Sequence, residues 1–291
     1  MKFGDKIPFE SATVIPAVGN SANAAVSAAR LGLSSALISD VGADRYGAEC
    51  IVSLKKDAVS TKYVRVHKGM ETNYHYVLWY GDERTILVKH QDYKRIIPSF
   101  TPPRWLYLSS LGSNSYDYQL ALVEWLKKHS EVKLAFQPGT FQISLGDKLE
   151  DVYRRTDLFF CNKEEAQRIL GSAETDAKKL MNMLRAMGPK TVVLTDGPRG
   201  AYAYDGTTAY FMPLYPDPKP PFERTGAGDA YASTLTVALA LGKTLEEALM
   251  WAPINSASVV QDIGAQRGLL TQKQILEWLT KAPADYKPRK I

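Results

Sequence analysis

The feature that most constrains the fold of this sequence is a regular alternation of strand-like and helix-like segments along most of its 291 residues. The short apolar runs "KLAF" and "DLFFCN" are each followed by a segment whose apolar residues recur at helical spacing, and "TVVLT" comes directly after such a segment. Strands that alternate with helices predict an α/β fold with a mainly parallel sheet covered on both faces. Ligands of such sheets bind at the carboxyl ends of strands, so a site is expected in the loops after Asp40, Leu111, Phe136 and Thr195.

Two regions interrupt the alternation. Residues 61–67 and 72–90 are rich in Tyr, Val, Thr and Ile, and they predict a β-hairpin with a turn at Gly81 and Asp82. The run "AYAYDGTTAYFMP", at residues 201–213, predicts a second hairpin. Helices are expected at residues 21–32, 46–57, 118–129, 145–155, 163–171 and 176–188, and three more are expected to begin near Gly228, Thr244 and Thr271.

Composition and charge argue against several classes of protein. The chain is 45% hydrophobic and has a net charge of +5, but its Lys and Arg are scattered rather than gathered in the stripe of a nucleic-acid binder. Cys50 and Cys161 have no Cys or His nearby at metal-ligand spacing, so neither a disulfide framework nor a zinc site is indicated. The sequence shows no membrane-spanning run and no signal-peptide core, so we expect a cytoplasmic protein without membrane or nucleic-acid partners.

The stretch "RTGAGDAYASTLTVALALG" places a glycine-rich turn directly before an apolar helix that ends at Gly242. Gly226 and Gly228 allow the chain to turn tightly and to approach a ligand closely. The unpaired N–H groups of a helix start attract anions such as phosphate. Asp229 at this position is read in two ways, either as a helix cap or as a carboxylate base beside an anion site.

Six segments, in this order, resemble the ribokinase family, also called the PfkB carbohydrate kinases. They are "VGNSANAAVSAARLG" (18–32), "DVGADRYGAE" (40–49), "CNKEEA" (161–166), "LTDGPRGAYAY" (194–204), "TGAGDAYAS" (225–233) and "NSASVVQDIGAQRG" (255–268). The resemblance covers nearly the whole chain. It implies a single domain over residues 1–291, folded as a ribokinase-like three-layer sandwich. A small β-sheet lid is implied at about residues 6–18 and 62–92.

The resemblance implies a transfer of the γ-phosphoryl group of ATP to a hydroxyl of a small carbohydrate. Catalysis of such a transfer is mostly positioning and stabilisation of charge on the transferred group. The backbone N–H groups of Gly226, Ala227 and Gly228 would hold that charge, and Asp229 would accept the hydroxyl proton. The helix dipole favours the ionised form of Asp229.

The family also implies a nucleotide and magnesium site. Asn162 and Glu165, three residues apart after a strand, would lie near Mg²⁺ and the phosphates, with Glu165 reaching the metal through water. The same "NKEE" pattern is also that of a helix cap with an acidic first turn. The remaining expected ATP contacts are Thr195, Gly197, Gly200, Thr225 and Asn255. A plain hairpin turn at Gly197 and Gly200, and a core or exposed Asn255, are the alternatives.

Gly19, Asn20 and Asn23 are the expected substrate contacts, because the family binds sugar hydroxyls with a glycine-rich turn and an Asn at this place. An Asn can both donate and accept, which suits a pair of hydroxyls; a helix cap is the alternative for Asn23. Aromatic residues gather in the expected lid, namely Tyr74, Tyr76, Trp79 and Tyr80. In the family such a lid covers the substrate and often pairs with the lid of a second subunit, so the resemblance implies a homodimer. Ordinary packing between strands is the alternative role for most of these aromatic residues.

Three departures from the family pattern are visible. The apolar strand and Asp with which the family usually begins are missing before "MKFGDKIPF"; an incomplete sequence, a start placed too late or a naturally shortened relative would explain this. Glu223 and Arg224 stand in "ERTGAGD" where "DTTGAGD" is usual, so the role of a monovalent cation is left open. Gly19-Asn20 replaces Gly-Gly, and "QPGTFQ" replaces "DPN-x-R", which leaves the substrate open.

The first interpretation is therefore an ATP- and Mg²⁺-dependent sugar kinase. A nucleoside kinase of the same fold is the nearest alternative, since the lid aromatics would stack on a base. A non-catalytic regulatory relative that binds nucleotide is the alternative from another class.

Overall fold

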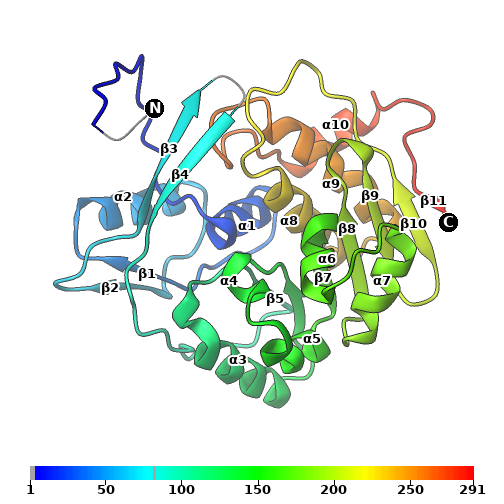
Figure 1. The fold of residues 1–291 in the computed structure, drawn as a ribbon, viewed down its shortest axis with the longest axis horizontal. Helices are drawn as coiled ribbons and strands as arrows, with labels where there is room; N and C mark the ends of the chain where they lie inside the picture. The colour runs from blue at the N-terminus through cyan, green and yellow to red at the C-terminus, as the bar shows by residue number, and fades with distance from the viewer. Residues whose placement is uncertain (1–3, 81–82) are drawn as a thin grey trace.

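The computed structural model describes residues 4–80 and 83–291, and a seven-stranded sheet forms the centre of the molecule (Figure 1). Its strand order is β11-β10-β9-β8-β7-β6-β5. The strands are β5 (Trp105–Leu108), β6 (Lys133–Phe136), β7 (Leu158–Asn162), β8 (Thr191–Thr195), β9 (Ala201–Tyr204), β10 (Ala209–Met212) and β11 (Arg289–Lys290). Strands β5 to β8 pair in parallel, whereas β8 to β11 pair antiparallel. The sheet is thus parallel in the half that alternates with helices, and the predicted hairpin at β9–β10 makes the other half antiparallel.

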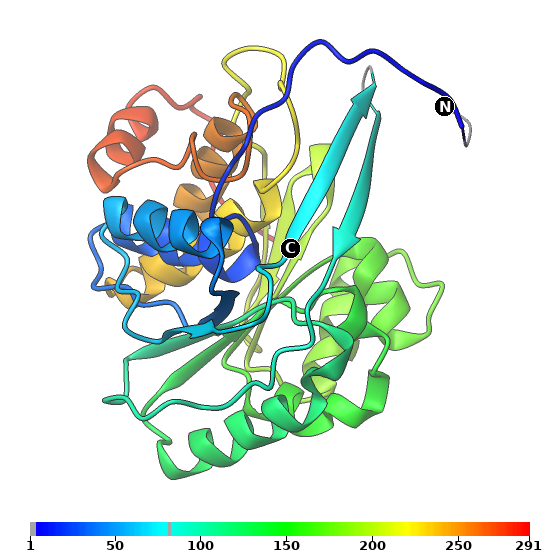
Figure 2. The ribbon, with the colours of Figure 1, turned by 90° about the vertical axis from the view of Figure 1, so that its left-hand side faces the viewer.

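Helices cover both faces of this sheet, which gives the predicted three layers (Figure 2). On one face lie α1 (Asn20–Arg30), α8 (Ala227–Ala240), α9 (Leu245–Val259) and α10 (Gln272–Leu279). On the other lie α3 (Tyr116–Lys128), α5 (Glu150–Arg155), α6 (Lys163–Leu170) and α7 (Ala177–Ala186). Short helical turns lie in the loops that follow strands β5, β6 and β8, namely η1 (Ser113–Ser115), α4 (Thr140–Ile143) with η2 (Gly146–Leu149), and η3 (Gly197–Arg199).

Strand β7 shows why the sheet has two cores. Successive side chains of a strand point to opposite faces. Leu158 and Phe160 accordingly belong to the core beneath α8 and α9, while Phe159 and Cys161 belong to the core beneath α5 to α7. Both sets are buried, so the strand reads as a continuous apolar run, as expected of an interior parallel strand.

Two smaller sheets lie beside the central one. Strands β1 (Ser39–Gly42) and β2 (Val64–His67) pair in parallel, with α2 (Arg45–Lys56) between them. The prediction that residues 61–67 belong to the hairpin is therefore wrong. The hairpin itself is confirmed as β3 (Tyr74–Tyr80) and β4 (Glu83–Lys89), although its turn at Gly81 and Asp82 lies outside the described residues.

The β3–β4 hairpin projects beyond the helical layers, and the N-terminal arm runs past it (Figure 2). Residues 6–18 of that arm form no strand, and the first described element is α1. Several apolar side chains of the hairpin are exposed, among them Tyr76, Trp79 and Leu87. The lid role of these segments stays a prediction.

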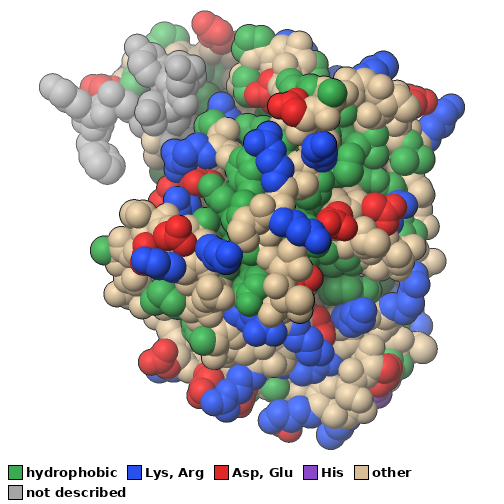
Figure 3. All heavy atoms as spheres, turned by 90° about the vertical axis from the view of Figure 1, so that its right-hand side faces the viewer, with side chains coloured by type: hydrophobic (Ala, Val, Ile, Leu, Met, Phe, Trp, Pro, Cys, Tyr) green, Lys and Arg blue, Asp and Glu red, His purple; other side chains and the backbone are tan. Residues whose placement is uncertain are grey.

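The charge distribution on the surface and the hydrophobicity of the helices can be compared with the sequence-based arguments against a nucleic-acid binder and a membrane protein. On the face shown in Figure 3, lysine and arginine side chains are mixed with aspartate and glutamate. Within the described part of the chain, no helix combines the length and the hydrophobicity needed to cross a membrane.

Candidate active site

Helix α8 begins at the glycine-rich turn and carries Asp229 in its first turn. Gly226 is the residue before the helix, with φ of +82°, and Asp229 is the third residue of the helix. The first N–H groups of a helix have no acceptor within the helix, so they face the same end of α8 as the turn. No side chain caps α8. The interpretation of Asp229 as a helix cap is therefore wrong.

The carboxylate of Asp229 instead accepts hydrogen bonds from three side-chain amides. Asn20 Nδ2 donates to Oδ1 at 2.8 Å, and Asn23 Nδ2 donates to Oδ2 at 2.8 Å. Gln137 Nε2 donates to Oδ1 at 3.3 Å. Helix α1 packs on α8, and Gln137 directly follows β6, so the fold brings these residues together from positions far apart in the chain (Figure 1).

Two opposed effects act on the acidity of Asp229. Burial raises the pKa of Asp229 because the charged form loses its water. The hydrogen bonds from Asn23, Asn20 and Gln137 lower this pKa in part, since they stabilise the carboxylate. A buried carboxylate surrounded by donors has the features of a proton acceptor at a functional site.

The two glycines of the turn have different roles. A Cβ on Gly226 would lie 2.3 Å from the Cβ of Ala265, so this position must be glycine for packing as well as for its positive φ. A Cβ on Gly228 would meet only Gln137 Nε2, at 3.8 Å. Nothing within the described chain requires glycine at position 228, and an anion at the start of α8 stays a prediction.

Asn162 and Glu165 form a capping box at the start of α6. Asn162 Oδ1 accepts from the Glu165 N–H at 2.7 Å, and Glu165 Oε2 accepts from the Asn162 N–H at 2.9 Å. Burial raises the pKa of Glu165. Among the described residues no group of three or more His, Cys, Asp or Glu could hold a metal ion. Mg²⁺ commonly binds through one or two carboxylates, waters and substrate phosphates, and Glu165 fits that mode.

The expected nucleotide turn follows β8, and Thr195 lies opposite Asn162 in the register of β7 and β8. Gly197 and Gly200 have φ of +52° and +98°, and they form a turn into β9. A Cβ on Gly200 would lie 2.5 Å from the Met212 carbonyl oxygen. The turn alternative is thus realised, and the nucleotide role of these residues stays a prediction. Thr225 directly precedes the Gly226 turn.

Asp196, in the same turn, was not singled out from the sequence. It is buried, and its carboxylate accepts from Arg199 Nε at 3.0 Å and pairs with Lys163 Nζ at 3.4 Å. The hydrogen bonds from Arg199, and the charge of Lys163, lower the pKa of Asp196. One carboxylate therefore holds two cationic side chains at the carboxyl ends of β7 and β8.

Asn255 does not contact the site, contrary to the prediction. Its side chain is fully buried, its Nδ2 donates to Thr234 Oγ1 at 2.7 Å, and its Oδ1 accepts from the Leu270 N–H at 2.8 Å. Both ends of the amide are thus used to join α9 to α8 and to the segment before α10. The interior alternative is correct for this residue.

We expect the Asn255→Ala variant to lose stability rather than affinity for ATP. The substitution leaves the Leu270 N–H and the Thr234 hydroxyl without their partner, at about 1–3 kcal/mol for each buried group. Urea unfolding would measure the loss, and KM for ATP of the folded enzyme should stay within about twofold of the wild type. A large rise in KM with unchanged stability would restore Asn255 to the nucleotide site.

The sequence model of the pfkB family of carbohydrate kinases matches residues 10–272. This chain belongs to the pfkB family. It is thus a phosphotransferase with an alcohol group as acceptor. A ribokinase of Bacillus subtilis is 27% identical over 286 residues, which are 96% of this chain and 92% of that protein. A nucleoside kinase of Methanothermobacter thermautotrophicus is 25% identical, over 86% of this chain and 80% of its own.

The solved structures agree on the fold. The structure of an Arabidopsis thaliana ribokinase complexed with ribose and ATP superposes with a TM-score of 0.79. It shares 21% identity with this pfkB kinase and covers 94% of this chain and 93% of its own. At that identity the likeness establishes the ribokinase-like fold.

The acceptors around Glu223 bear on the open question of a monovalent cation in this pfkB kinase. Glu223 Oε1 accepts from the Gly264 N–H, whereas its Oε2 is buried without a hydrogen-bond partner among the described residues. Gln261 Oε1 is also buried without one. Arg224 is exposed. Two buried acceptor oxygens, on Glu223 and Gln261, thus lack a hydrogen-bond partner in the described part of the chain, and the role of a monovalent cation stays as open as the sequence leaves it.

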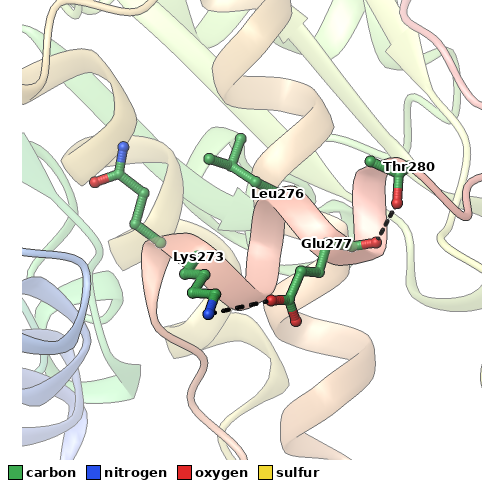
Figure 4. Close-up of a pocket in the computed structure, with 5 residues that line it drawn as sticks. Lys273, Leu276, Glu277 and Thr280 are labelled. Carbon is green, nitrogen blue, oxygen red and sulfur yellow. Dashed lines mark hydrogen bonds and ion pairs between the residues drawn. The ribbon is translucent and has the colours of Figure 1, made fainter.

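A surface hollow on α10 is unrelated to the predicted site. It is lined by Gln272, Lys273, Leu276, Glu277 and Thr280, with an ion pair of 3.9 Å between Lys273 and Glu277 (Figure 4). None of these residues belongs to the motifs that predicted the site, so the candidate active site of the pfkB kinase remains at the start of α8.

Proposed function

We propose that this pfkB kinase transfers the γ-phosphoryl group of ATP to a hydroxyl of a small carbohydrate, with Asp229 as the general base. The observation that carries the proposal is the buried Asp229 carboxylate at the glycine-rich start of α8, held by amides of Asn20, Asn23 and Gln137. The names of the relatives support a sugar as acceptor, since a ribokinase is similar over nearly the whole chain.

In this proposal each group has one task. Asp229 accepts the proton of the acceptor hydroxyl. The N–H groups of Gly226, Ala227 and Gly228, at the turn into α8, stabilise charge on the transferred group. Gly19, Asn20 and Asn23 orient the acceptor. Thr195, Gly197, Gly200, Thr225 and Asn162 would position ATP. Mg²⁺, held near Glu165 through water, would neutralise charge on the phosphates.

A nucleoside acceptor is the second candidate, and a specific observation favours it. Tyr76 and Trp79 of the projecting hairpin have exposed fractions of 59% and 46%, and exposed rings are platforms on which a base can stack. A nucleoside kinase is among the similar proteins. The same exposed hairpin is the basis for the predicted homodimer.

The test is ATP consumption with Mg²⁺ against pentoses, hexoses, sugar acids and nucleosides. We expect turnover with a free sugar at a kcat/KM at least about tenfold above that for any nucleoside. Turnover on adenosine without turnover on any free sugar would favour the nucleoside candidate. ATP binding without transfer to any acceptor would contradict both and favour a regulatory relative.

A further inference from the structure

The Asp229 carboxylate has a second layer of contacts that the proposed function does not use. Tyr107 donates its hydroxyl proton to Gln137 Oε1 at 2.5 Å, and Gln137 Nε2 in turn donates to Asp229 Oδ1 at 3.3 Å. Tyr107 lies in β5 opposite Ala135 of β6. Gln137 lies two residues beyond Ala135, so the period of two places it on the same face, toward α8.

The direction of the Gln137 amide is fixed by this contact. Burial, and the nearby Asp229 charge, raise the pKa of Tyr107 well above its usual range, so its hydroxyl stays protonated and remains a donor. The amide oxygen takes that proton, and the NH₂ group must face the carboxylate. A reversed amide would set its oxygen against Asp229, acceptor against acceptor.

A matching contact fixes Asn23 on the other side of the carboxylate. Gln266 Nε2 donates to Asn23 Oδ1 at 2.9 Å, so the NH₂ group of Asn23 faces Asp229. The contacts of Asp229 from α1 and from the loop after β6 are thus all with amide donors, and Tyr107 of β5 is the titratable side chain beside them. A protonated Asp229 would find no acceptor in the amides of Asn23 and Gln137, whose directions these contacts fix.

The donors are shared unequally between the two carboxylate oxygens. Asn20 and Gln137 both donate to Oδ1, whereas Oδ2 receives only Asn23. Each oxygen has two lone-pair sites. Oδ1 is therefore filled, and Oδ2 keeps one site.

We propose that Tyr107 and Gln137 are positioning residues. Tyr107 orients the Gln137 amide, and Gln137 then completes the donors to Oδ1 of Asp229, which keeps the carboxylate ionised and leaves Oδ2 to take the substrate proton. This inference rests on the proposed function of Asp229 as the base. In the step, the hydroxyl proton moves to Oδ2, the hydroxyl oxygen bonds to the γ-phosphorus, and the bond from that phosphorus to the β–γ bridging oxygen breaks to release ADP. No further reactant is needed.

The test is the pH dependence of kcat/KM for the Gln137→Leu and Tyr107→Phe variants. Loss of the Gln137 donor makes the carboxylate harder to keep ionised, so the acidic limb should move to higher pH. We expect kcat/KM of Gln137→Leu to fall about tenfold on the acidic limb and to stay within about twofold on the alkaline plateau. Tyr107→Phe should shift the limb in the same direction by less, because the amide is then only misoriented.

Tyr153→Phe is the matched control, since Tyr153 is a buried tyrosine of the other core whose hydroxyl has no hydrogen-bond partner among the described residues. Its pH profile should match the wild type. A uniform fall at every pH in Gln137→Leu, or an unmoved limb in both variants, would overturn the positioning role. If Gln137→Leu does not fold, Tyr107→Phe decides alone.

The two proposals fail in distinguishable ways. Full turnover in Asp229→Asn would refute both proposals, namely that Asp229 is the base and that Tyr107 and Gln137 position it. Collapse of turnover in Asp229→Asn, combined with an unmoved acidic limb in Gln137→Leu and Tyr107→Phe, would remove only the positioning role.

Discussion

The Asp229→Asn variant is expected to lose about 10²–10⁴-fold in kcat, with KM for ATP nearly unchanged. Asparagine has almost the same shape as aspartate but cannot accept the proton. Its NH₂ group would also face the amide donors to position 229, so urea unfolding and ATP binding of the variant are measured beside the kinetics to separate loss of the base from loss of the fold. Steady-state kinetics over a range of acceptor and ATP concentrations would separate kcat from KM.

Asp157→Asn is the matched control for this prediction. Asp157 is also a largely buried carboxylate, and it accepts from the Leu134 N–H and pairs with Arg155 and Lys190 just before β7. It lies at the amino end of β7, away from the loops that follow the strands, so its loss should cost stability but leave kcat within about twofold. Equal falls in kcat in both variants would point to general damage.

The Gly226→Ala variant is expected to lose both stability and activity. Its Cβ would lie 2.3 Å from the Cβ of Ala265, at a φ of +82° that favours glycine. Strain and overpacking of this kind cost about 1–3 kcal/mol each. Displacement of the N–H groups at the start of α8 should lower kcat by at least about 10²-fold, as loss of a comparable donor does elsewhere.

Gly228→Ala separates ligand approach from packing. The added Cβ would meet only Gln137 Nε2 at 3.8 Å, so thermal unfolding should show equal or slightly higher stability, since alanine favours a helix over glycine by up to about 1 kcal/mol. If phosphate approaches this backbone, kcat/KM should still fall by at least about tenfold. A fully active Gly228→Ala variant would contradict an anion site at this turn.

The elements that could be predicted from the sequence are those whose signal is local. Composition and spacing predict buried strands such as β7 and the small-residue helix α8. The turn residues between β9 and β10 predict that hairpin. The pairing of β2 was missed because "VRVH" has the same local pattern whether it joins a hairpin or lies parallel to β1. Strand β11 was not predicted, because a segment of two residues, Arg289–Lys290, carries no local strand pattern.

The residues of the candidate site likewise fall into those that a local sequence pattern reveals and those that only the fold reveals. Asp229 was visible because the glycine-rich turn stands next to it in sequence. Gln137 was not, although the rule that ligands lie at strand ends had pointed to the loop after Phe136. Its role depends on contacts to Tyr107 and Asp229 that only the fold creates. The prediction for Asn255 was wrong in the opposite way, because a residue expected to contact ATP proved to be structural. The sequence cannot distinguish a buried amide that joins three segments from an exposed one.

The most direct measurement is phosphoryl transfer from labelled ATP to the best acceptor in a single turnover, with wild-type protein, Asp229→Asn and Asp157→Asn side by side. If Asp229 is the base, the wild type and Asp157→Asn form the phosphorylated acceptor at similar rates, while Asp229→Asn binds ATP and forms it at least about 10²-fold more slowly. Equal rates in all three proteins would contradict the assignment of Asp229.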